Sequence, residues 1–237
     1  MSGKKSKLPP YDGKAQRDRH AEIWSNALTA NVLQYPDTAI VAYFAKTWPD
    51  RIANKGRKAL DIGFGSGRNF GLLADYGFEI HGLEISDTAL ALGQRVLDGL
   101  GQPGHLAKVA LEEYTPPAHK FDALIYWGGI FLTPPEGIAA SLRHCHDLLK
   151  PGGGLIVNFR TPENWFYGLG TEVAPSTFKL DERSGPYEAN VYCFLTEAES
   201  STLLRQAGFE IENIERIDHW KENAGKRHSW TLYWARK

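Results

Sequence analysis

A glycine-rich turn between two apolar runs constrains this chain more than any other stretch of its sequence. The run Lys58-Ala59-Leu60-Asp61-Ile62 leads into Gly63-Phe64-Gly65-Ser66-Gly67, and a second apolar run over 78–83 ends at Glu84. Glycine allows positive φ and lets a ligand approach the backbone closely. A carboxylate at the end of the second strand accepts hydrogen bonds from ribose hydroxyls. The stretch therefore predicts a strand, a turn, a helix and a second strand that together bind a nucleotide.

The spacing of the glycines excludes two common nucleotide-binding motifs. The dinucleotide fingerprint G-x-G-x-x-G needs a glycine where this chain has Arg68, because the third glycine, Gly67, comes one residue early. A P-loop starting at Gly63 would need glycine and then lysine from its sixth position, which Arg68 occupies. The form that remains is D-x-G-x-G-x-G, which begins at Asp61 and is followed by an acid at the end of the next strand.

Apolar runs and helix signals alternate along the chain, and this alternation predicts the fold class. We expect mostly parallel strands, joined through helices by right-handed crossovers. The expected strands span residues 58–62, 78–83, 105–109, 121–126 and 155–159. Helical structure is expected within residues 11–54, and further helices are expected over 69–76, 86–100 and 135–149.

The last quarter of the chain breaks this alternation. Thr196-Glu197-Ala198-Glu199 is a capping box that starts a helix, and the helix is expected to end at Ala207-Gly208. Strands over 209–217 and 229–235 follow, and the polar segment between them is too short for a parallel crossover. We therefore predict an α/β fold with a Rossmann-like, doubly wound, seven-stranded sheet that is mostly parallel and has an antiparallel C-terminal strand.

One domain accounts for nearly the whole chain, since 237 residues suit a single open α/β unit. We expect residues 1–10 to form a disordered tail and residues 11–237 to form a single domain. Within it, residues 11–54 are expected to form an N-terminal helical cap. Residues 161–192 combine a loop composition with an aromatic cluster, so we expect them to form a lid over a substrate.

Composition limits which classes of binding partner and which cell compartment we expect for this protein. The formal net charge is −1, so no overall attraction to nucleic acid is expected. Only Cys145 and Cys193 are present, which favours a reducing cytoplasm over a disulfide framework. No apolar run approaches the about 20 residues of a membrane span, and the lysines near Met1 precede no signal-peptide core. We expect a cytoplasmic protein with neither a membrane nor a nucleic acid as partner, and the oligomeric state stays open.

Four motifs in order resemble the class I S-adenosylmethionine-dependent methyltransferases. Leu60 to Asn69 looks like motif I of that family, and Phe121 to Ile125 looks like its fourth strand. Leu148 to Gly153 is similar to the turn into its fifth strand, and Thr196 to Phe209 resembles the helix and strand that follow. Gly67-Arg68-Asn69 is also similar to the tellurite-resistance and thiopurine-type branch. The resemblance covers the chain from Leu60 to its C-terminus.

The resemblance implies S-adenosylmethionine as the cofactor. By position, Gly63 and Gly65 would approach its methionine part, and Glu84 would bind its ribose. Two roles remain open for Arg68: it would contact the carboxylate of the cofactor, or it would be a solvent-exposed residue at the start of a helix. Tyr126 and Trp127 would line the gap between methyl donor and acceptor. The full set of expected cofactor residues is Asp61, Gly63, Phe64, Gly65, Gly67, Arg68, Glu84, Ile85, Leu111, Glu112, Tyr126 and Trp127, with Ile85, Leu111 and Glu112 beside the adenine.

The sequence says less about which residues would bind the methyl acceptor. The aromatic residues expected to wall its pocket are Trp24, Tyr35, Trp165 and Tyr167. His20, His219 and His228 titrate near neutrality, but their spacing selects no general base, so we predict no catalytic residue. His144-Cys145-His146 places its two histidines on different faces of a helix, so we predict no metal site.

The leading functional prediction is methyl transfer to an oxygen, nitrogen or sulfur atom of a small molecule. Tyr126-Trp127-Gly128-Gly129 stands where many base-amino methyltransferases have D/N-P-P-Y/F/W. The alternatives are methylation of RNA or protein and a non-catalytic module that binds S-adenosylmethionine. A further alternative, an NAD-dependent oxidoreductase, is disfavoured by Arg68 and by the antiparallel hairpin.

Overall fold

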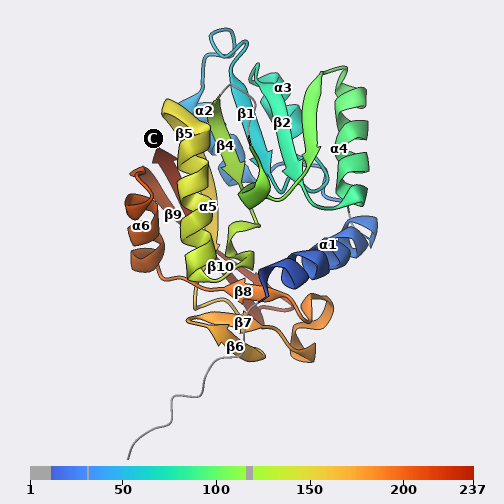
Figure 1. The fold of residues 1–237 in the computed structure, drawn as a ribbon, viewed down its shortest axis with the longest axis vertical. Coiled ribbons are helices and arrows are strands. Elements are labelled where there is room, and N and C mark those ends of the chain that lie inside the picture. The colour runs from blue at the N-terminus through green and yellow to red at the C-terminus, as the bar shows by residue number, and fades with distance from the viewer. Residues whose placement is uncertain (1–11, 31, 116–119) are drawn as a thin grey trace, which may run out of the picture.

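A seven-stranded sheet with helices on both faces organises the residues that the computed structural model describes, 12–30, 32–115 and 120–237 (Figure 1). The tail expected over residues 1–10 lies outside these ranges. The strand order is β3-β2-β1-β4-β5-β10-β9. The strands are β1 (Lys58–Ile62), β2 (Glu79–Glu84), β3 (Gly104–Lys108), β4 (Phe121–Tyr126), β5 (Leu149–Arg160), β9 (Glu210–Lys221) and β10 (Lys226–Arg236).

The pairing of the strands confirms the predicted fold class. Strands β1 to β5 pair parallel to their neighbours, and β10 pairs antiparallel to both β5 and β9. The largest difference from the predicted strand boundaries is in β5, which begins at Leu149 and includes the Pro151-Gly152-Gly153-Gly154 segment expected as a turn. Leu149 pairs with Phe121 of β4, and the ladder resumes at Gly154 after an irregularity. Strands β9 and β10 also extend further toward their shared turn than predicted.

Alternation along the strands divides the apolar side chains between two cores. Leu60 and Ile62 of β1 join one core, and Ala59, which directly precedes Leu60, joins the other. Helices α5 (Pro135–Leu148) and α6 (Glu197–Gln206) pack into the first core, and α2 (Thr38–Thr47), α3 (Phe70–Asp75) and α4 (Asp87–Leu100) pack into the second. Two predicted caps are present: the Ser86 side chain caps α4, and Thr196 with Glu199 forms the capping box of α6.

A second, smaller sheet occupies the segment expected as a loop-like lid. Strands β6 (Thr171–Ala174), β7 (Thr177–Lys179) and β8 (Val191–Cys193) pair antiparallel in that order, with the 3₁₀ segment η3 (Glu182–Tyr187) before β8. The loop-like composition of this segment does not prevent strand pairing, because aromatic side chains in and beside the short strands pack together. Phe178 of β7, for example, meets the ring of Tyr167 edge to face and the ring of Phe194 at a tilted angle.

Helix α1 (Gly13–Ala30) lies across the edge where the parallel strands end, between the main sheet and the small sheet (Figure 1). Between β3 and β4, by contrast, the described residues form only the short 3₁₀ turn η1 (Leu111–Glu113) and no α-helix. Nowhere in the described ranges does a helix combine the length and the apolar character needed to cross a membrane.

The side chain of Phe64 locks the glycine loop onto the framework. Its ring is buried and lies over Gly82 of β2 and Gly93 of α4, two positions without a side chain. A Cβ atom at Gly82 would lie 2.6 Å from Cδ1 of Phe64, and one at Gly93 would lie 2.6 Å from its Cε2. The two glycines therefore create the socket that holds the loop.

We predict that Gly82→Ala destabilises the fold by about 1–3 kcal/mol, because the added methyl group overpacks the Phe64 socket. Gly99→Ala in α4 is the matched control: nothing lies within 4 Å of its Cβ position, so alanine should stabilise the helix by up to about 1 kcal/mol. Chemical denaturation followed by circular dichroism measures both changes. Equal effects of the two substitutions would contradict the socket.

Candidate cofactor and acceptor site

The glycine loop leaves open space beside its main chain. Gly63, Gly65 and Gly67 all have positive φ, at +67°, +60° and +76°. A Cβ atom at Gly63 would meet nothing within 4 Å, and one at Gly65 would meet only the indole nitrogen of Trp24 at 4.0 Å. At Gly67 the Cβ position lies 3.0 Å from the ring of Phe70. The first two glycines thus face space that a ligand can fill, and the third allows close packing.

The Glu84 carboxylate faces this loop from the end of β2. Its Oε2 accepts a hydrogen bond from the Gly65 amide at 3.1 Å, and its Oε1 accepts from the amides of Ile85 at 2.7 Å and Ser86 at 3.3 Å. Burial raises the pKa of the carboxyl group, and these three amides oppose that shift. Because Oε2 accepts from one amide, it keeps capacity for a hydroxyl group.

Asp61 and Asn69 form a second buried polar pair beneath the loop. The Asn69 Nδ2 donates to the Asp61 Oδ2 at 3.0 Å. Burial raises the pKa of Asp61 to about 7, while Asn69 and the charge of Arg68 oppose the rise. The Oδ1 of Asn69 is buried and has no hydrogen-bond partner among the described residues. An unpaired buried acceptor of this kind matches a donor group on a bound molecule. Asn69 was not among the predicted site residues, although it follows the motif directly.

The other predicted cofactor residues differ in their position relative to the edge of the sheet where the parallel strands end. Ile85 follows β2 and Leu111 follows β3, so both lie at the ends of adjacent parallel strands. Glu112 is exposed and pairs with Arg17 of α1. The Phe64 side chain points into the core, so any contact from it to a ligand in the loop must come from its main chain. The ring of Tyr126 is buried at the end of β4, and Trp127 beside it is half-buried.

Helix α1 packs against the glycine loop and the start of α4. Trp24 of α1 lies over Gly65, and the Ser25 hydroxyl forms a hydrogen bond with the Ser86 hydroxyl at 2.7 Å. At the other end of the helix, Gln16 donates from Nε2 to the carbonyl of Ala189 at 3.0 Å. The helix therefore contacts both the cofactor loop and the segment leading into β8.

A buried arginine lies at the same edge of the sheet, at the end of β5. Arg160 is the last residue of β5, and its guanidinium carbon lies 4.5–5.5 Å from the centroids of four aromatic rings. We call this group the Arg160 cage; its rings are Phe131, Phe166, Tyr192 and Trp230. The Nε and Nη1 atoms of Arg160 are buried without a hydrogen-bond partner among the described residues, and burial lowers the pKa of the guanidinium.

Of the four predicted acceptor residues, only Trp165 adjoins this cage. Its ring centroid is 4.1 Å from that of Phe166, a member of the cage. Tyr167 packs instead on Phe178 and Phe194, and Trp24 lies over the cofactor loop. Tyr35 is 79% exposed. Arg160 was not among the predicted site residues; the signal that could have identified it is a basic residue at the end of a largely apolar strand.

The histidines near the site have their Nε2 lone pairs occupied. His228 Nε2 accepts from the Trp165 indole at 3.2 Å, and His20 Nε2 accepts from the Val191 amide at 3.4 Å. Burial lowers the pKa of each to about 4, so both imidazoles are neutral at pH 7. In a neutral ring one nitrogen accepts and the other carries the proton. Neither ring, as placed, has a free acceptor for an incoming proton.

Known proteins match both the motif region and most of the chain. Residues 59–153 match a family model described as a methyltransferase domain. The chain is 29% identical over 171 residues to a ubiquinone biosynthesis O-methyltransferase of Thiobacillus denitrificans, which covers 70% of this chain and 71% of that protein.

Solved structures share the fold along nearly the whole chain. The 1,6-didemethyltoxoflavin-N1-methyltransferase of Burkholderia thailandensis, solved with S-adenosylhomocysteine bound, superposes with a TM-score of 0.63 at 18% identity and covers 97% of this chain and 92% of its own. The cyclase SpnF superposes with a TM-score of 0.66 at 16% identity and covers 98% and 99%. At these identities the likeness shows the fold alone, and the cyclase shows that this fold also serves other chemistry.

We predict that Glu84→Ala weakens binding of S-adenosylmethionine about 10- to 100-fold, the loss expected for hydrogen bonds to a charged group. Isothermal titration calorimetry measures the affinity. Glu113→Ala is a control acid at the same edge, since its side chain is exposed and pairs with Arg17. Unchanged affinity in a folded Glu84→Ala protein would contradict the assignment of the ribose ligand.

The raised pKa of Asp61 predicts a pH-dependent stability in the ligand-free protein. Unfolded Asp ionises near pH 3.9, whereas folded Asp61 keeps its proton until about pH 7. Between these values ionisation favours the unfolded state, so stability falls as pH rises through this window. Asp61→Asn lacks this dependence. The free energy of unfolding of Asp61→Asn relative to wild type should therefore rise between pH 5 and pH 8, and a constant difference would contradict the shift.

Proposed function

The chain belongs to the class I S-adenosylmethionine-dependent methyltransferases, and we propose that its acceptor is a hydroxyl group on a small aromatic molecule that carries an anionic substituent. The observation that carries this proposal is the buried Arg160 at the carboxyl edge of the sheet, whose Nε and Nη1 atoms have no hydrogen-bond partner among the described residues. In open α/β sheets ligands bind outside the carboxyl ends of the strands, and β1, β2, β4 and β5 all end at this edge.

The cofactor, S-adenosylmethionine, supplies a methyl group on a positively charged sulfur atom, which is already a strong electrophile. The protein's main tasks are to align the acceptor and to exclude water, and alignment contributes about 7–11 kcal/mol where it is good. Glu84 would hold the ribose, and Gly63 and Gly65 would border the methionine part. Asp61 and the unpaired Oδ1 of Asn69 offer acceptors for the cofactor's ammonium group.

An aromatic hydroxyl suits the chemistry of the acceptor side. The curated relative is named an O-methyltransferase, which supports oxygen as the accepting atom. A phenol ionises near pH 10, as tyrosine does, and so gives up its proton more readily than an alcohol. This agrees with a site where neither His20 nor His228 has a free Nε2. The rings of the cage and Trp165 supply flat apolar surface for such a molecule.

Arg160 supports an anionic substituent. A guanidinium stays protonated in proteins, and among the described residues Arg160 has a side-chain hydrogen bond to Tyr192 but no ion pair with a carboxylate. An unpaired buried charge costs several kcal/mol, and cation–π contacts return about 0.5–2 kcal/mol each. A carboxylate on the acceptor would pair with the donors that Nε and Nη1 now leave unpaired. This charge pairing would also discriminate against neutral analogues.

The surrounding segments complete the proposal. Residues 161–192, which contribute Phe166 and Tyr192 to the cage, would form the lid, and residues 11–54 would cap the cofactor side through α1. Cys145 and Cys193 are both buried and free, which supports the cytoplasm as the compartment.

The test compares hydroxybenzoic acids with their methyl esters as acceptors, by the rate of S-adenosylhomocysteine formation. We expect the acids to be preferred, and Arg160→Met to lower kcat/KM for the acids about 10- to 100-fold while leaving the esters and the affinity for S-adenosylmethionine unchanged. If Arg160→Met fails to fold, Arg160→Lys is the second variant to be measured, because it keeps the positive charge. An equal preference for acid and ester in the wild type would contradict the proposal.

A further inference from the structure

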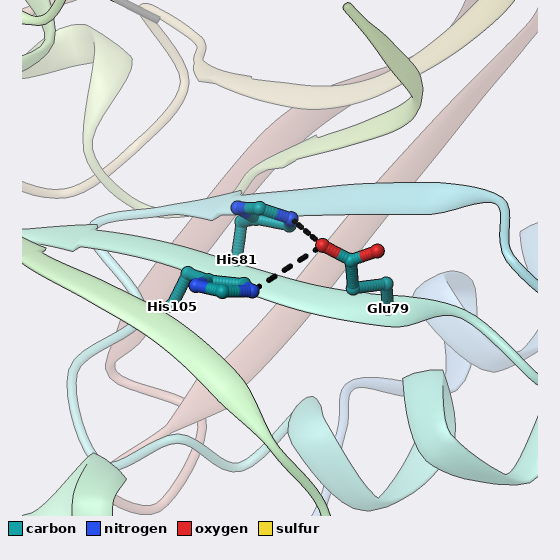
Figure 2. Close-up of side chains that lie close together, drawn as sticks. All are labelled: Glu79, His81 and His105. Atoms are coloured by element: carbon teal, nitrogen blue, oxygen red, sulfur yellow. Dashed lines mark hydrogen bonds and ion pairs between the residues drawn. The ribbon is translucent and has the colours of Figure 1, made fainter. Parts of the chain in front are cut away.

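Three side chains of types that can bind metal ions, Glu79, His81 and His105, lie close together on β2 and β3 (Figure 2). Glu79 begins β2, and Glu84 ends it. The Oε1 of Glu79 lies 2.8 Å from Nε2 of His81 and 3.4 Å from Nε2 of His105. All three donor atoms lie within 4.8 Å of one another. The two imidazole rings stack, with their centroids 4.6 Å apart, so both nitrogens point to the same place.

The sheet itself fixes this arrangement. Glu79 and His81 are two residues apart on β2 and so share a face of the sheet. His105 is the Cα partner of His81 on the neighbouring parallel strand β3. Side chains held by paired strands cannot move far apart, so the three donors are preorganised.

The donors line an open groove of about 460 Å³, whose wall also includes Lys58, Leu83 and Tyr114. The described residues between β3 and β4 form no α-helix that would cover this face. His105 is 64% exposed, whereas His81 is 6% exposed at its side chain. A solvent-borne ion can therefore reach the donors, and water can complete its coordination.

The spacing of the donors is close to that of a tetrahedral zinc site. Zinc bonds of about 2.0–2.1 Å place neighbouring ligand atoms about 3.4 Å apart. The contact between Glu79 and His105 already has this length, and the contact between Glu79 and His81 must open by about 0.5 Å. Two imidazoles and one carboxylate are a donor set that zinc favours.

Lys58 is the competing cation. Its Nζ lies 2.9 Å from the same Oε1 of Glu79. An ion at the centre of the cluster has to displace this ammonium group, which is 23% exposed and sits on a flexible stem. Removing the lysine charge should therefore strengthen metal binding, an effect that a plain hydrogen-bonded cluster does not predict.

We propose that Glu79, His81 and His105 bind one Zn²⁺ ion, with the remaining position open to water. Glu79 and Glu84 stand at opposite ends of β2, about 16 Å apart at the usual rise of a strand, so the ion takes no part in methyl transfer. Its effect is to tie the edge strand β3 to β2. Zinc should raise the melting temperature, because it binds the folded chain and bridges two strands.

The experiment titrates chelator-treated, full-length protein with Zn²⁺ by calorimetry and with Co²⁺ by visible absorption. We expect one ion per chain and the intense Co²⁺ bands of tetrahedral coordination. His105→Ala removes an exposed ligand and should weaken Zn²⁺ binding about tenfold or more, and Lys58→Met should tighten it. His219→Ala, on β9 at the far edge of the sheet, removes an exposed histidine and should change nothing.

Each outcome decides the proposal. Stoichiometric binding that His105→Ala weakens and Lys58→Met strengthens would support it. Absence of Zn²⁺ binding to the wild type, or binding that neither substitution changes, would overturn it. The rate of methyl transfer should be the same in wild type and His105→Ala, so failure of this proposal leaves the proposed acceptor untouched.

Discussion

The buried Glu84 carboxylate is the interaction on which the site depends. It accepts amide hydrogen bonds from the glycine loop through Gly65 and from the start of the next helix through Ile85 and Ser86. Burying this charge is tolerable only because main-chain donors face it. The carboxylate thereby fixes the loop after β1 against the end of β2, and this is where the ribose is expected. Ser86 extends the connection, since its hydroxyl bonds Ser25 of α1.

The two halves of the site differ in how the fold builds them. The glycine loop, the Glu84 carboxylate and the pair of Asp61 with Asn69 form the proposed cofactor half, so a short stretch of sequence suffices to encode it. Side chains from four separate segments form the proposed acceptor half: Phe131 follows β4, Phe166 follows β5, Tyr192 lies on β8 and Trp230 lies on β10. Those segments meet around Arg160 only after folding, which allows the acceptor to vary while the cofactor stays the same.

This difference explains what the sequence could predict. The strands, the caps at Ser86 and Thr196, the antiparallel hairpin and the place of Glu84 all follow from local patterns. The burial of Phe64 does not, because it depends on Gly82 and Gly93 in other elements. The Arg160 cage and the small sheet depend on contacts distant in sequence, and so does the position of Trp24 over Gly65. The convergence of His81 with His105 requires the pairing of β2 with β3, so the expectation of no metal site rested on local spacing alone.

The most direct test of the central claim is calorimetric titration of the purified protein with S-adenosylhomocysteine, with NAD as the control. S-adenosylhomocysteine lacks the transferable methyl group, so the measurement isolates the cofactor half from the unknown acceptor. We predict that S-adenosylhomocysteine binds at one site per chain with micromolar affinity and that NAD does not bind. Absence of binding, or binding of NAD in its place, would contradict the assignment of the glycine loop and Glu84 as the site for S-adenosylmethionine.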